Sequence, residues 1–457
     1  MPPALTRRRC LQLGLPLAGA LAWPSGAAAA PIGLPPLALR ERRLDNGLQV
    51  VSAIDRRHPT VAVQVWYRVG AKDDPPGRSG FAHLFEHLMF KSTRHMPNEM
   101  FDRLTEDVGG QNNAYTTEDM TAYQSEVPSN HLERLLWAEA ERMAHLTVDQ
   151  ANFDSERQVV IEEFREAVLA DPYGRLFNAL PGLAFQVHPY RRPVIGRIED
   201  LQAASLTDVQ HFHRTYYRPD NAVLVVVGDF DPADLDPWVD LHFGGLTSPT
   251  QPVPRVAVRE PAMATDRVVR LAAPQVPLPA VALLWRGLPA SHPDAAALEV
   301  AAALLSAGES SRLNETLVYR DQAAQSAGFS ADGYADAGLL AAFAIAAGGR
   351  STGSLAEALF GAVRRLAQGP LPAAELDKVR MRLLTQALGA RQSPQGQAEA
   401  IGRALLLRGH AGDANRALAR LQAVGAGDVQ RALTRHLLQT RRVTVHYTQG
   451  RASGVPA

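Results

Sequence analysis

Alternating and continuous apolar runs along the chain predict β-strands, and longer amphipathic stretches predict helices. From Thr60 to Val69 apolar side chains occupy every second position, which is typical of a half-buried strand. Residues 222–227 are apolar without interruption and predict a fully buried strand. The turn Asp45-Asn46-Gly47 separates two further strand-like runs. The beginning of the chain therefore predicts a sheet whose strands alternate with helices.

The second part of the chain repeats this order of elements. The first part continues with a hairpin or long strand at 112–127 and helices at 81–90, 100–108, 131–144 and 152–169. In the second part strands are predicted at 280–285, 338–346 and 442–447, and helices at 293–305, 354–368 and 373–390. The strand at 442–447 mirrors that at 222–227. Residues 247–265 contain several prolines and no sustained apolar period, so they predict a linker. We expect two related α/β halves, residues 38–246 and 266–450.

Length and composition agree with a soluble protein of more than one unit. The chain has 457 residues, which is more than one ordinary core accommodates. Hydrophobic residues make up 46% and charged residues 21%, with a formal net charge of zero. Nothing in this balance indicates a nucleic acid or an anionic membrane surface as partner.

The first residues predict a signal peptide at 1–29. Arg7-Arg8-Arg9 form a positive region, 11–22 form a short apolar core, and 26–30 offer small residues for cleavage. We expect the cut after Ala29 and a periplasmic or secreted protein with no stable membrane anchor. The triple arginine is similar to a twin-arginine export signal, and a general secretory signal with one extra arginine is the alternative.

Export removes Cys10, the only cysteine of the chain. The mature protein then has no disulfide and no thiol chemistry. Any metal must therefore be held by His, Asp or Glu.

The segment His83-Leu84-Phe85-Glu86-His87 has metal-site spacing on a predicted helix. His83 and His87 lie one turn apart on one face, where two imidazoles can bind one tetrahedral ion. Glu86 lies on the same side and can act on water, as in the inverted form of the His-Glu-x-x-His motif. A helix with two solvent-facing histidines is the alternative. A third ligand must come from elsewhere, and the acid-rich helix at 156–166 is a candidate, although a solvated face would explain its charges too.

These residues resemble the pitrilysin/insulin-degrading-enzyme family, which includes the mitochondrial processing peptidases. In that family a glutamate about 76 residues after the second histidine completes the zinc site, and another lies about seven residues before it. The resemblance implies Glu163 as third ligand, ahead of Glu162, and Glu156 as a second carboxylate that holds a ligand histidine or the attacking water.

Further matches extend over most of the mature chain. They are 80–93, 110–116, 188–190, 194–196, 217–221 and 227–229. In relatives the strand within 110–116 is an edge strand that receives the substrate backbone, and Asn113, Ala114 and Tyr115 are the matching positions. A turn at Asn112-Asn113 is the alternative.

One part of the family pattern is missing. Active members that work as one chain or as a homodimer take an Arg and a Tyr from the second half to hold the peptide and stabilise the oxyanion. Here Val318 and Gln325 stand at those positions. Arg312 and Tyr319 have the same seven-residue spacing but lie earlier in the register, so we interpret them as a coincidence. We expect a homologous subunit without zinc to supply the pair in a heterodimer, with a homodimer less favoured.

The resemblance therefore implies an α+β fold of two homologous α/β halves, each a mostly antiparallel sheet packed with helices on one side. It implies a zinc-dependent endopeptidase that cleaves short or unfolded peptides in an enclosed chamber. One Zn²⁺ per chain would be held by His83, His87 and Glu163, with Glu86 as general base. A non-catalytic scaffold of the family's core-subunit type is the alternative.

His211 and His213 are expected to have surface or packing roles, and His188 a structural one.

Overall fold

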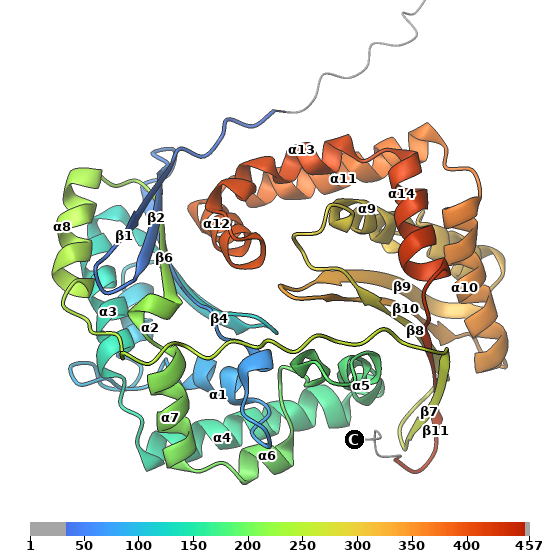
Figure 1. Cartoon of the computed structure of the whole chain (residues 1–457), viewed down its shortest axis with the longest axis horizontal. Helices are drawn as coiled ribbons and strands as arrows, with labels where there is room; N and C mark the ends of the chain where they lie inside the picture. The colour runs from blue at the N-terminus through green and yellow to red at the C-terminus, as the bar shows by residue number, and fades with distance from the viewer. Residues whose placement is uncertain (1–32, 453–457) are drawn as a thin grey trace, which may run out of the picture. The chain divides into compact units, whose positions relative to one another are not determined.

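Two β-sheets organise the chain, one in each predicted half (Figure 1). The structure is a computed structural model that describes residues 33–452, so the predicted signal peptide, residues 1–29, lies outside the described residues. The first sheet has six strands in the order β1-β2-β6-β3-β5-β4. Their bounds are β1 Leu39–Arg43, β2 Gln49–Ile54, β3 Thr60–Tyr67, β4 Gln111–Thr116, β5 Thr121–Pro128 and β6 Ala222–Gly228.

The second sheet has five strands in the order β7-β11-β8-β10-β9. They are β7 Arg267–Ala273, β8 Ala280–Gly287, β9 Ala324–Gly333, β10 Gly338–Ala346 and β11 Val443–Gln449. Strand β6 pairs parallel with β2 and antiparallel with β3. Strand β11 likewise pairs parallel with β7 and antiparallel with β8. Both strands come late in their half of the chain. All other pairs are antiparallel. The same order of strands, apart from β1, confirms two homologous, mostly antiparallel halves.

Helices fill the connections. They are α1 Phe81–Leu88, α2 Met100–Glu106, α3 Leu132–His145, α4 Gln150–Phe164, α5 Gly174–Ala184, α6 Ile198–Gln202, α7 Leu206–Tyr216, α8 Pro232–Phe243, α9 Ala295–Ser306, α10 Thr352–Gln368, α11 Ala373–Ala390, α12 Pro394–Arg408, α13 Ala417–Ala423 and α14 Ala426–Leu433. The helix predicted at 152–169 ends its α-helical part at Phe164 and continues as a π-helical segment, Arg165–Ala170.

Both faces of the first sheet are buried. One face packs on helices of its own half, with Val61, Val63 and Val65 of β3 in that core. The other face, which includes Ala62 and Trp66, packs on α12 of the second half. Strand β3 is therefore buried on both sides, whereas its alternating pattern predicted a half-buried strand. Burial against a distant helix outweighs the local pattern.

The segment 247–265 contains no helix or strand, but polar contacts hold it along its length. Arg255 donates to the backbone oxygen of Arg68 and to Asn221. Glu260 accepts three backbone N–H groups at 186–188. This connection is therefore fixed on the first half, and the chain from Pro35 onward forms one compact unit.

Among the residues that the structure describes, no helix combines the length and the apolar character that crossing a bilayer requires.

Candidate metal centre and peptide-binding edge

Helix α1 presents the histidine motif on its outer face. Phe81, Leu84 and Phe85 point into the core and are fully buried. His83, Glu86 and His87 are half-buried on the other side. The rings of His83 and His87 lie 5.0 Å apart and nearly perpendicular to each other. The spacing of apolar and polar residues thus turns the motif toward one common point.

Glu163 on α4 completes a group of three possible ligands. Its Oε2 lies 3.6 Å from His83 Nε2 and 3.5 Å from His87 Nε2. The donor atoms of the three residues lie within 4.8 Å of one another. Glu162, the neighbouring alternative, is exposed and pairs with Arg165. The structure therefore brings Glu163, and not Glu162, to the two histidines.

Glu156 lies two turns before Glu163 on the same face of α4 and is almost fully buried, with 7% of its side chain exposed. Its Oε2 lies 3.6 Å from His87 Nδ1, while its Oε1 pairs with Lys91 Nζ at 2.7 Å. The imidazole of His87 thus lies between two carboxylates. A carboxylate behind a histidine fixes the ring and makes its other nitrogen a better ligand.

Glu86 is oriented by a strand of the sheet. The hydroxyl of Thr116, the last residue of β4, donates to Glu86 Oε2 at 2.7 Å. Burial raises the pKa of Glu86, although the bond from Thr116 and the nearby His87 act in the opposite direction. A carboxyl with a raised pKa suits proton transfer near neutral pH.

The two histidines have opposite pKa shifts. Burial and the neighbouring His87 lower the pKa of His83 to about 4, against the attraction of Glu163. Burial also lowers the pKa of His87, but Glu156 and Glu163 outweigh it and raise this pKa to about 9. The hydrogen bond with His87 lowers the pKa of Glu163. At neutral pH His83 is therefore a neutral, ligand-competent imidazole, and His87 carries a proton that a metal would displace.

The start of α1 is fixed by two close contacts. The buried carboxylate of Asp74 accepts from the backbone N–H groups of Gly80 and Ala82, at 2.7 and 2.9 Å. Gly80 has φ +97° and lies against Gly196, where a Cβ on Gly196 would stand 2.5 Å from the Cα of Gly80. Only glycine fits at either position. These contacts set where His83 lies.

The donor set fits zinc. Tetrahedral zinc binds His nitrogen and carboxylate oxygen at about 2.1 Å, which separates ligand atoms by about 3.4 Å. The two measured distances to Glu163 are close to this value. Lacking cysteine, the site offers the nitrogen and oxygen ligands of a catalytic zinc centre.

The predicted peptide-binding residues lie on a free sheet edge. Asn113, Ala114 and Tyr115 belong to β4, the last strand of its sheet, which pairs only with β5 among the residues that the structure describes. They therefore form a strand and not the alternative turn. The N–H of Ala114 donates to the side chain of its neighbour Asn113 at 2.9 Å. One backbone N–H group of β4 is thus already bonded to a side-chain amide of the same strand.

Val318 and Gln325, which stand at the family's Arg and Tyr positions, both lie in the second half. Val318 is on the π-helical segment Asn314–Arg320, and Gln325 is exposed on β9. Arg312 is bound in two places by Glu375, at 2.8 Å each, and Tyr319 is exposed. Arg312 therefore has a structural partner in its own half.

Two of the remaining histidines, His213 and His188, have packing roles. His213 stacks on Phe85 and Tyr217, with ring centroids 5.7 Å away in both cases. His188 is buried, and its Nδ1 accepts from the N–H of Tyr190. His211 is exposed on α7, at the surface.

Three residues that contact the site were not identified from the sequence: Asp74, Lys91 and Thr116. Lys91 is four residues after His87 and so lies on the same side of the chain, which could have indicated that it also contacts Glu156. Asp74 and Thr116 carry no such signal, because their contacts depend on how a loop and a strand meet α1.

Family profiles match both halves of the chain. The profile described as "Insulinase (Peptidase family M16)" matches residues 49–197. The profile described as "Peptidase M16 inactive domain" matches residues 203–383. The two matches follow each other along the chain, and the second begins before β6, the last strand of the first sheet.

Individual proteins agree with these profiles. The zinc protease PqqE of Helicobacter pylori is 33% identical over 343 residues, which cover 74% of this chain and 77% of that protein. A probable mitochondrial-processing peptidase subunit beta of Arabidopsis thaliana is 26% identical over 406 residues, covering 87% and 76%. The crystal structure of a protease from Helicobacter pylori superposes with a TM-score of 0.86 at 29% identity, covering 90% of this chain and 99% of that one. The chain therefore belongs to the insulinase family of peptidases, family M16.

Proposed function

We propose that the chain is a zinc-dependent endopeptidase that hydrolyses short or unfolded peptides. The observation that carries this proposal is the convergence of His83, His87 and Glu163, from two helices, beside the oriented carboxylate of Glu86. Similarity to a protein named as a zinc protease supports it. One zinc ion per chain would be held by these three residues.

Each polar group of the site has a role in this reaction. A bound zinc ion supplies Lewis acidity, which polarises the scissile carbonyl and acidifies water. Glu86 accepts the proton of the attacking water and then donates it to the leaving amine, and the Thr116 hydroxyl holds its carboxylate toward the site. Glu156 holds the ring of His87. The free edge of β4 binds the peptide backbone as an added strand, with Asn113, Ala114 and Tyr115 at the contact.

We further propose that this chain is the zinc-bearing subunit of a heterodimer whose two chains enclose the chamber. Val318 and Gln325 offer no cation or phenol, and Arg312 is held by Glu375. A homologous subunit would supply the Arg and Tyr. The predicted signal peptide supports a periplasmic or secreted site of action.

Substitution Glu86→Gln tests the peptidase. The change should lower peptide hydrolysis by about 10²–10⁴-fold while one zinc per chain remains, because Gln cannot take up the proton. Hydrolysis of a quenched fluorescent peptide and zinc content by atomic absorption measure the two effects. Glu162→Gln is the matched control on α4 and should change neither.

A non-catalytic scaffold would give a different result. It would carry no stoichiometric zinc, and Glu86→Gln would alter nothing. Either finding in the mature protein with its partner present would contradict the proposed function.

A further inference from the structure

The edge strand β4 is held by the second half of the chain. The hydroxyl of Tyr115 donates to Glu399 Oε1 on α12 at 2.7 Å. The other oxygen of Glu399 accepts from Gln124 on β5 at 2.5 Å. One carboxylate from the second half thus bridges the last two strands of the first sheet.

Glu399 and Glu86 hold adjacent residues from opposite faces. Side chains alternate along a strand, so Tyr115 and its neighbour Thr116 point to different sides of the sheet. Thr116 donates to Glu86 on the α1 side, and Tyr115 donates to Glu399 on the α12 side. The strand is therefore fixed at the point nearest the general base by one bond on each face.

Helix α12 is itself closely docked, so Glu399 has a defined place. A Cβ on Gly402 would lie 2.1 Å from the ring of Trp66, which shows how closely the helix approaches the sheet. Gln64 on β3 donates to the backbone oxygen of Gln395, and the buried side chain of Gln397 donates to Asp55 at 2.5 Å. These contacts surround Glu399 on its helix.

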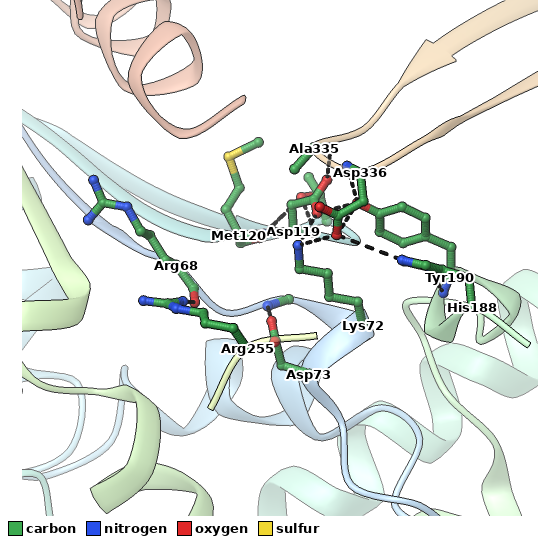
Figure 2. Close-up of polar contacts among 12 residues, drawn as sticks. Arg68, Lys72, Asp73, Asp119, Met120, His188, Tyr190, Arg255, Ala335 and Asp336 are labelled. Carbon is green, nitrogen blue, oxygen red and sulfur yellow. Dashed lines mark hydrogen bonds and ion pairs between the residues drawn. The ribbon is translucent and has the colours of Figure 1, made fainter. Parts of the chain in front are cut away.

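A second junction clamps the turn that follows β4, as Figure 2 shows. Asp119 in that turn accepts from the N–H of Ala335, in the β9–β10 turn, at 2.8 Å. Lys72 bridges Asp119 at 2.8 Å and Asp336 at 3.0 Å. The hydroxyl of Tyr190 donates to Asp119 at 2.5 Å and accepts from the N–H of Asp336 at 3.0 Å. This junction, too, joins the strand's end to the second half.

We propose that Glu399, supported by this second junction, is a positioning residue that holds β4 in the conformation that captures the substrate backbone. The inference rests on the peptide-binding role proposed for β4. Strand addition needs a straight edge with its N–H and C=O groups in fixed directions, because the peptide is bound through those groups. The second half, which contributes no member of the metal centre, thus takes part in substrate binding.

The test measures peptide binding by zinc-loaded protein in a Glu86→Gln background, so that cleavage does not interfere. Fluorescence anisotropy of a labelled 20-residue unfolded peptide gives Kd, and hydrogen exchange reports the amides of 111–116. Glu399→Ala should raise Kd about tenfold and speed exchange of these amides, since the bond is made to a charged acceptor. Zinc content should stay unchanged.

Three further variants separate positioning from general loss of structure. Tyr115→Phe removes the same bond from the strand side, so it should reproduce the effect, and the double variant should add little to it. Glu399→Gln keeps one neutral acceptor oxygen and should raise Kd less than Glu399→Ala does. Glu357→Ala, an exposed glutamate on α10 without a side-chain bond within the described chain, is the matched control and should leave Kd unchanged.

The outcomes distinguish this inference from the proposed function. Unchanged Kd and unchanged exchange in both Glu399→Ala and Tyr115→Phe would overturn the positioning role. Should the parent protein bind no peptide even with its partner present, the peptidase proposal fails, while the exchange of 111–116 still decides whether Glu399 holds the strand.

Discussion

The imidazole of His87 is the most strongly held group of the site, because carboxylates lie on both of its nitrogens. Glu163 faces the proposed metal position, and Glu156 lies behind the ring with Lys91 as its own partner. A histidine that is fixed in this way loses less rotational freedom when a metal binds. The two glutamates of α4 thus have separate tasks, although both contact the same ring.

Substitution Glu156→Gln should weaken zinc binding about 10- to 100-fold, because the ring of His87 loses the charge that orients it. Competition with a chelator measures the zinc affinity. Glu162→Gln, one position before Glu163 and exposed, should leave it unchanged. An unaltered affinity in Glu156→Gln would show that the carboxylate does not support the ligand.

Zinc binding should release about one proton near pH 7.5. In the metal-free protein His87 is protonated below its pKa of about 9, and the metal must displace that proton. Affinity should therefore rise about tenfold per pH unit from pH 6 and level off above pH 9. Calorimetric titrations in two buffers of different ionisation enthalpy count the proton. Binding without proton release would contradict the raised pKa.

Residues within one helix were easier to predict than residues between elements. The spacing of His83, Glu86 and His87 determines their common face by helix geometry alone. Glu163 required a family distance as well, since nothing local distinguishes it from Glu162. Thr116 and Asp74 act through contacts between segments, and no pattern within either segment indicates them.

Among whole elements, too, those with a clear local pattern were predicted and those that depend on a distant partner, such as α12, were not. The strands at 222–227 and 338–346 were predicted nearly to the residue, because their apolar runs are continuous. Helix α12 was not predicted. It contains Gly396 and Gly402 and mixes polar with apolar residues, because the side that faces the sheet both bonds to polar groups and packs on Ala62 and Trp66. Its pattern makes sense only with that sheet beside it.

Substitution Gly402→Ala should destabilise the protein by about 1–3 kcal/mol, because the added methyl group must displace the Trp66 ring. Urea denaturation measures the free energy of unfolding. Gly389→Ala on α11 is the control, since nothing lies within 4 Å of its Cβ position. That change should be neutral or stabilise by up to about 1 kcal/mol. Equal effects of the two substitutions would mean that α12 does not dock closely.

At the scale of the whole molecule, the two halves share a fold but not a chemistry. Strand β9 occupies in the second sheet the edge that β4 occupies in the first. The proposed zinc ligands are all in the first half, and Glu399 of the second half bonds to the strand beside them. The proposed reaction also needs a cation or phenol to stabilise the developing oxyanion, and Val318 and Gln325 at the family's positions offer neither.

The zinc-loaded chain alone should therefore hydrolyse unfolded peptides at least about 100-fold more slowly than the chain with its homologous partner, because an oxyanion donor is missing. Co-purification of the mature chain from its host, followed by assays with and without the partner, measures the difference. High activity of the single chain that survives Arg312→Ala combined with Tyr319→Phe would contradict the heterodimer.

The docking of α12 also has a consequence for the time course of synthesis. The first sheet is complete once β6 has left the ribosome, but α12 follows about 165 residues later. At about 5–20 residues per second, the apolar face of that sheet waits roughly 10–30 s for its cover. During this interval Val51, Trp66 and Val223 are exposed to any chaperone or neighbouring chain. A nascent chain halted between the two halves is therefore the form in which this protein is most liable to aggregate.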